Sequence, residues 1–161
     1  MIDIAPAVPA DLPAIHALIR GLADYERLAD LCTGTEAELR DALFGNPPAA
    51  EVLVARVDGA VAGFALFFPT FSTFLARRGL WLEDLFVVPA MRGLGVGRAL
   101  LAAVAGVAHA RGCGRFEWAV LDWNAPAIGF YEGLGATLMP EWRLARVTGP
   151  ALTTMAKGTR G

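Results

Sequence analysis

Apolar residues recur along the chain at two spacings, one typical of helices and one typical of strands. Spacings of three and four, together with start and stop signals, predict helices that begin at Asp11–Pro13 and at Thr35 and that cover Val96–Ala110 and Asn124–Gly133. Runs rich in β-branched and aromatic residues predict strands over Ile2–Ala5, Glu51–Val57, Ala60–Phe68, Leu80–Val88, Arg115–Leu121 and Trp142–Val147. Asp58-Gly59 predicts an antiparallel hairpin, and Pro69–Gly79 an aromatic loop. The order β-α-α-β-β-β-α-β-α-β indicates a mixed α+β fold in a single domain, residues 1–161.

Composition narrows the classes of function. Apolar residues make up 55% of the 161 positions and charged residues 19%, which is typical of a globular protein. The net charge of −2 provides no basic field for nucleic acid or an anionic membrane. Cys32 and Cys113 lack the spacing of a disulfide framework or a zinc site, so we expect no metal. With no signal-peptide pattern at the start, the predicted location is the cytoplasm.

A glycine-rich turn between a predicted strand and a predicted helix is the most informative motif. Over Val87–Arg98 it places Arg92 before Gly93, Gly95 and Gly97. Glycines let a backbone approach an anion closely, and the first N–H groups of the helix point at it. A plain tight turn would also use glycines, but the arginine favours phosphate binding. The third glycine of a dinucleotide fingerprint and the lysine of a Walker loop are both missing.

The R-x-x-G-x-G arrangement closely resembles the pyrophosphate motif of the GNAT superfamily of acyl-CoA N-acyltransferases. Downstream, Leu121–Tyr131 followed by Gly135-Ala136 resembles the Asn and FYxxxGA signature of the same superfamily. The segments Tyr25-Glu26, Leu82–Val87 and Glu141–Arg143 are similar to the spermidine/spermine (diamine) acetyltransferase branch. The resemblance implies a GNAT fold with a mostly antiparallel six- or seven-stranded sheet and about four helices. It also implies a homodimer and acetyl-CoA as co-substrate.

The resemblance further implies site residues. Acetyl-CoA would be held by Leu85, Phe86, Val87, Arg92, Gly93, Leu94, Gly95, Val96, Gly97, Arg98, Asn124, Pro126, Ala127 and Tyr131. The amine substrate would be bound by Tyr25, Glu26, Glu83 and Trp142.

The chemistry of an amine acceptor agrees with this set. A primary amine with a pKa of ~10.4 is protonated at pH 7, and removing the proton unaided costs about 4 to 5 kcal/mol. As the resemblance implies, Glu83, expected to point inward from its strand, would accept that proton through one or two waters. Tyr131, at the matching motif position, would protonate the departing thiolate, and the Val87 N–H would donate to the thioester carbonyl.

Each residue also has a structural interpretation. Glu83 could be a solvated strand-edge charge, Tyr131 and Trp142 core aromatics, and Tyr25-Glu26 the end of a helix. Three functions therefore stay open: acetylation of a polyamine, diamine or thialysine-like amine, acetylation of a protein N-terminus or lysine, and acyl-CoA binding without catalysis. The aromatic loop over Phe71–Arg78, interpreted as a lid over a small site, favours the first.

Overall fold

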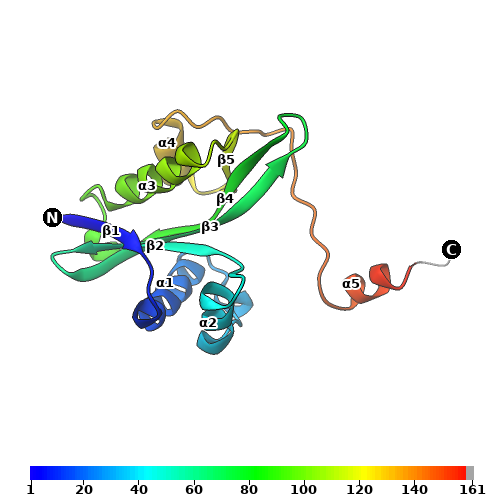
Figure 1. Ribbon diagram of the computed structural model, residues 1–161, viewed down its shortest axis with the longest axis horizontal. Coiled ribbons are helices and arrows are strands. Elements are labelled where there is room, and N and C mark those ends of the chain that lie inside the picture. Colours follow the sequence, from blue (N-terminus) through cyan, green and yellow to red (C-terminus); the bar gives the residue numbers. More distant parts are fainter. Residues whose placement is uncertain (159–161) are drawn as a thin grey trace. The chain divides into compact units, whose positions relative to one another are not determined.

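A five-stranded sheet organises the first unit of the computed structural model, which describes residues 1–158 (Figure 1). The strands are β1 (Ile2–Pro6), β2 (Glu51–Val57), β3 (Ala60–Ser72), β4 (Arg77–Val87) and β5 (Arg115–Trp118). They lie side by side in chain order, with β1 to β4 antiparallel and β5 parallel to β4. This unit spans Met1–Ala119, and a second unit begins at Val120. The predicted α+β class is confirmed.

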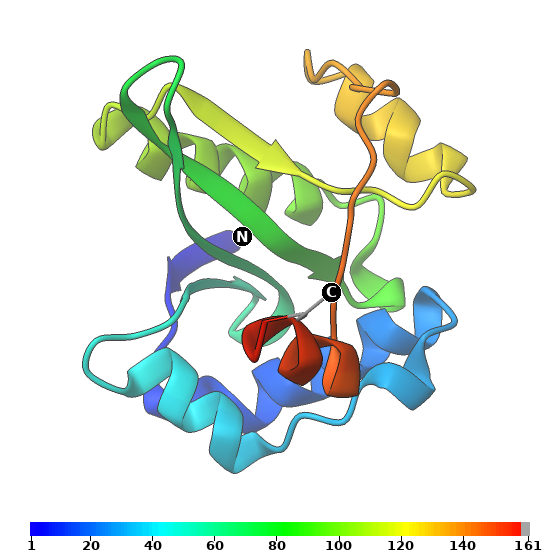
Figure 2. The ribbon, with the colours of Figure 1, turned by 90° about the vertical axis from the view of Figure 1, so that its right-hand side faces the viewer.

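Helices cover both faces of the sheet in the first unit. On one face lie α1 (Leu12–Tyr25) and α2 (Glu36–Phe44), and on the other lies α3 (Val96–Ala110) (Figures 1 and 2). Short 3-10 turns η1 (Pro9–Asp11), η2 (Ala29–Leu31) and η3 (Pro89–Met91) join them. The parallel pairing of β5 with β4 requires a crossover, and α3 provides it.

The core on the α1 side consists of side chains from both helices and from the sheet. Phe64 at the centre of β3 is fully buried, as are Leu12 and Ile15 of α1. Neighbouring residues of a strand point to opposite faces, so Leu66 shares the face of Phe64 and packs into the same cluster. Phe86 of β4 lies opposite Phe64 and extends the cluster toward the end of α1.

The predicted helix cap at Thr35 is present, and the one at Asp11 is not. Thr35 caps α2, with its hydroxyl accepting from Glu38 N at 3.2 Å and its own N–H donating to the Glu38 carboxylate at 2.9 Å. The side chain of Asp11 makes no cap hydrogen bond to α1. It accepts instead from Val8 N at 3.0 Å and forms an ion pair with Arg56 of β2. A buried carboxylate needs a charged partner, so the ion pair replaces the predicted cap.

The predicted loop over Pro69–Gly79 is wrong, because β3 and β4 form one long hairpin. Pro69 pairs with Leu80 and Ser72 with Arg77, so only residues 73–76 turn. The pairing of β2 with β3 ends at Phe67, so the missing N–H of Pro69 breaks no ladder bond there. The lid interpretation stays a prediction, and it now concerns the tip of a hairpin rather than a loop.

The second unit contains α4 (Ala125–Glu132) and α5 (Gly149–Ala156). The predicted strand over Trp142–Val147 is wrong: none of these residues belongs to a strand. An alternating pattern requires a neighbouring strand to become a ladder, and the sheet ends at β5. Within residues 1–158 the sheet thus has five strands rather than six or seven, and the α-helices number five rather than four.

Candidate active site

A β-bulge in β4 lies at Glu83. Across the β3–β4 ladder, Leu66 faces Asp84 and Phe67 faces Leu82, so Glu83 is the extra residue without a partner on β3. A bulge leaves its extra residue outside the ladder, re-aims side chains, and is common beside active sites. Glu83 is exposed, contrary to the expected inward orientation, because it lies outside the regular alternation.

The bulge also changes which side chains of β4 share a face. Trp81 lies opposite Phe68 and Asp84 opposite Leu66, and both β3 residues belong to the α1 side of the sheet. A regular strand would place residues 81 and 84 on opposite faces. The bulge therefore gathers Trp81 and Asp84 on the side that α1 covers.

Within this arrangement Trp81 contacts Glu83 directly. The indole Nε1–H of Trp81 donates to Oε2 of Glu83 at 2.8 Å. A charge-assisted hydrogen bond of this kind is stronger than a neutral one. It restricts a carboxylate that the bulge leaves in solvent.

Three carboxylates from two elements influence one another. Burial, then the negative charges of Glu83 and Glu26, raise the pKa of Asp84 from its ordinary 3.8 to about 6. Partial burial and the charge of Glu83 also raise the pKa of Glu26, which directly follows α1. Like charges held together disfavour ionisation, and an added cation would reverse this. The cluster of Glu26, Glu83 and Asp84, called here the carboxylate cluster, is thus chemically suited to an ammonium group.

Arg92 connects the glycine-rich turn to the end of α1. Its guanidinium carbon lies 4.9 Å from the ring centroid of Tyr25 and 5.5 Å from that of Phe86. Its Nε donates to the carbonyl of Val87 at 3.2 Å. Gly21 of α1 makes room for this packing, because a Cβ there would lie 3.1 Å from the Phe86 ring. The structure thus brings the predicted substrate residue Tyr25 beside the predicted phosphate residue Arg92.

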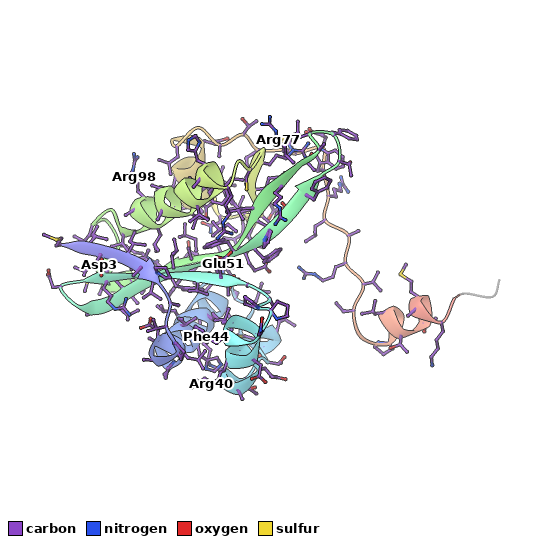
Figure 3. The ribbon with its side chains drawn as sticks, in the orientation of Figure 1. Asp3, Arg40, Phe44, Glu51, Arg77 and Arg98 are labelled. Carbon is purple, nitrogen blue, oxygen red and sulfur yellow. The ribbon has the colours of Figure 1, made fainter. Side chains whose placement is uncertain are left out.

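The glycine-rich turn has the geometry of an anion cradle. Gly93 and Gly95 adopt φ values of 79° and 85°, which residues with a side chain rarely adopt. Apart from the adjacent residues of the chain, no protein atom lies near the place where a Cβ would stand on either glycine. Gly95 is the N-cap of α3, and a glycine has no side chain to cap the first-turn N–H groups. Arg98 projects from α3 away from the sheet (Figure 3). The N-terminus of a helix that follows such a turn fits the phosphates of a coenzyme, and Arg98 on that helix adds positive charge.

The end of β4 presents a backbone donor at its edge. Val88 N donates to Ala62 O, so the flanking pair of Val87 with Gly63 is a non-hydrogen-bonded one. The N–H and C=O of Val87 therefore point away from β3. β5 pairs with β4 only as far as Leu82, so β5 does not pair with Val87. That is the orientation expected of a donor to an acyl carbonyl.

The remaining predicted residues belong to the second unit. Asn124 caps α4, with its Oδ1 accepting from Ala127 N at 3.3 Å, and Pro126 lies in the first turn of that helix. The ring centroid of Tyr131 lies 5.4 Å from that of Phe130. Trp142 is 74% exposed. The structure thus groups Tyr25, Glu26, Glu83 and Arg92 in one unit, and Asn124 and Tyr131 in the other.

Two residues that sequence reasoning did not single out belong to the site. Asp84 contributes to the carboxylate cluster, and Trp81 holds Glu83. The adjacent acids Glu83 and Asp84 break the alternation of an otherwise apolar strand, which is a signal of a bulge.

Comparisons with known proteins agree on one family. The sequence profile described as Acetyltransferase (GNAT) family matches residues 19–136. An L-ornithine N5-acetyltransferase of Arabidopsis thaliana is 37% identical, over 94% of this chain and 86% of that protein. A thialysine N-epsilon-acetyltransferase of Bos taurus is 37% identical, over 95% of this chain and 96% of that protein. A solved integron cassette protein of V. cholerae has a TM-score of 0.81 at 26% identity, over 98% of both chains.

Over residues 1–158, no helix is long and apolar enough to cross a membrane. The same residues contain no group of three or more His, Cys, Asp or Glu side chains arranged to hold a metal ion.

Proposed function

This chain belongs to the acetyltransferase (GNAT) family, and from that premise we propose that it acetylates the primary amine of a small diamine, polyamine or basic amino acid. The carboxylate cluster is the observation that carries the proposal. Substrates of this class have two or more nitrogen groups that are cationic at neutral pH. One of these nitrogen groups would lose its proton and react, while a second would stay protonated beside Glu26 and Asp84. Two relatives are named as acetyltransferases of ornithine and of thialysine, and both of these substrates belong to the proposed class of small amines with more than one nitrogen group.

Acetyl-CoA would supply an activated acetyl thioester. In our proposal its phosphates contact the N–H groups that open α3, together with Arg98 and a reoriented Arg92. The N–H of Val87 donates to the acyl oxygen. Asn124, Pro126, Ala127 and Tyr131 complete the set that the family resemblance assigns to this ligand.

Glu83 acts as the general base in this proposal. A primary ammonium with a pKa of ~10.4 must lose a proton before its nitrogen is nucleophilic. The exposed carboxylate of Glu83 accepts that proton through a water molecule. Asp84, with a pKa of about 6, is mostly ionised at pH 7 and contributes negative charge rather than a proton.

Tyr131 acts as the general acid, with its hydroxyl supplying a proton to the departing sulfur. A thiol has a pKa of ~8.5, so this protonation assists the reaction without being indispensable. We therefore expect removal of the Tyr131 hydroxyl to lower turnover less than removal of the Glu83 carboxylate.

The test is a thiol-release assay with acetyl-CoA and a panel of ornithine, thialysine, lysine, putrescine, spermidine and a peptide. We expect turnover of one or more small amines, a decrease in kcat of about 100-fold or more for Glu83→Gln, and a smaller decrease for Tyr131→Phe. Glu36→Gln on α2 is the matched control and should keep full activity. Preference for the peptide, or acetyl-CoA binding without turnover of any amine, would contradict the proposal.

Assembly into a homodimer stays a prediction of the family resemblance. Light scattering coupled to size-exclusion chromatography measures it directly, and a monomeric mass at micromolar concentration would contradict it.

A further inference from the structure

We propose that Trp81 is a positioning residue that selects which oxygen of Glu83 accepts the proton, an inference that rests on the proposed role of Glu83 as base. The hydrogen bond from Trp81 Nε1 to Glu83 Oε2 carries it. An exposed glutamate at a bulge would otherwise sample several rotamers. A general base must instead lie within hydrogen-bond reach of the proton that it receives.

The chemistry of the indole gives this contact a direction. An indole N–H donates and cannot accept, so it stays bonded to Oε2 in every protonation state of the carboxyl group. The amine passes its proton to a water, and that water passes one of its own protons to Oε1 of Glu83. The resulting carboxylic acid carries its hydroxyl at Oε1, while Oε2 continues to accept from Trp81.

The fold explains why residue 81 can do this. Residues 81 and 83 are two positions apart on one strand, their side chains meet in the hydrogen bond, and the bulge keeps Glu83 out of the ladder. Trp81 itself is in regular pairing with Phe68, and its side chain is half-buried. The donor is thus anchored by the sheet and the acceptor is not.

The first measurement is on the hydrogen bond itself and needs no turnover. The chain has four tryptophans, so its indole N–H signals are few enough to assign by NMR. Glu83→Ala should move the Trp81 indole proton upfield and speed its exchange with solvent. The signal of Trp118 should stay in place, because Trp118 pairs with Leu82, on the opposite side of the sheet from Trp81. An unchanged Trp81 signal overturns the proposal.

The second measurement is kinetic, with the amine of the panel that reacts fastest. Trp81→Phe should lower kcat about tenfold, the size of one charge-assisted hydrogen bond, with little change in KM. In the Glu83→Gln background the same substitution should have no further effect, since Trp81 acts only through Glu83. Trp118→Phe is the matched control and should keep the wild-type kcat. Additive losses in the double variant would show a merely structural role and overturn the proposal.

A second variant covers the case in which Trp81→Phe disturbs folding. Benzothienylalanine at position 81 keeps the shape of the indole and replaces its N–H by sulfur, so it should reproduce the loss in kcat with an unchanged melting temperature. If Glu83→Gln leaves kcat unchanged, the proposed base is wrong and this inference fails with it. If Glu83→Gln is defective and both variants at position 81 are fully active, only the positioning role is wrong.

Discussion

Replacing Asp84 by asparagine should stabilise the protein at neutral and alkaline pH. Its pKa rises from 3.8 to about 6 because burial and two neighbouring carboxylates disfavour the ionised form. One pKa unit corresponds to about 1.4 kcal/mol, so holding Asp84 ionised costs the folded state up to about 3 kcal/mol. Asparagine keeps the shape of the side chain and removes the charge.

The sign of the pH dependence follows from proton linkage. Between the unfolded and folded pKa values, 3.8 and about 6, the native state binds the Asp84 proton more tightly than the unfolded chain does. Stability contributed by this group is therefore complete at low pH and is lost as the pH rises through that window. The stability difference between Asp84→Asn and wild type should be smallest near pH 4 and reach its plateau above about pH 7.

Urea denaturation between pH 4 and pH 8 is the assay, because urea is uncharged and leaves electrostatic interactions unscreened. Using the difference between the two proteins cancels the titration of groups common to both, such as Glu51, whose pKa is lowered by Arg111. Asp41→Asn, at an exposed position of α2, is the matched control. A difference that is flat with pH, or destabilisation of Asp84→Asn at pH 8, would refute the electrostatic account of the cluster.

Three further substitutions test other parts of the structure. Thr35→Ala removes the hydroxyl that accepts from Glu38 N, keeps the backbone N–H that donates to the Glu38 carboxylate, and should lower the free energy of unfolding by about 1 kcal/mol in the same urea assay. Phe64→Ala leaves a cavity at the centre of the sheet and should cost about 3 to 5 kcal/mol, and a loss below 1 kcal/mol would contradict its central place in the core. Gly95→Ala forces a side chain onto a φ of 85° and should weaken acetyl-CoA binding in calorimetry, whereas an unchanged affinity would argue against the cradle.

Local signals predicted most of the first unit. The helix over Val96–Ala110 was predicted residue for residue, because its apolar spacing, its glycine start and the Arg111-Gly112 stop all agree. The capping box at Thr35 and the Asp58-Gly59 hairpin are likewise short-range features. One error, the predicted cap at Asp11, depends on a partner far along the chain. Asp11 forms an ion pair with Arg56, 45 positions away, and no local pattern indicates that pairing.

The candidate site divides in the same way. The family motif indicated the glycine-rich turn, Glu83 and Tyr25-Glu26. It gave no indication that Arg92 lies over the Tyr25 ring, or that Asp84 belongs with Glu26. The contact of Arg92 joins α1 to the turn after β4, beside the space that Gly21 leaves for Phe86. The electrostatic interaction of Asp84 with Glu26 joins β4 to the end of α1, and the bulge places Asp84 on that side of the sheet. Interactions between two elements distant in sequence leave no pattern in the sequence of either element alone, so they could not be predicted.

The bulge at Glu83 links the stability of this unit to its proposed chemistry. A regular β4 would place Trp81 and Asp84 on opposite faces, which would separate the anchor of Glu83 from the cluster beside α1. With the bulge, Asp84 is buried near the negative charges of Glu83 and Glu26, which costs folding free energy and raises the pKa of Asp84. A bound ammonium group would offset that repulsion, so the proposed binding of a cationic substrate would recover part of this folding free energy. The same substitution that stabilises the fold, Asp84→Asn, should for this reason weaken the binding of a diamine.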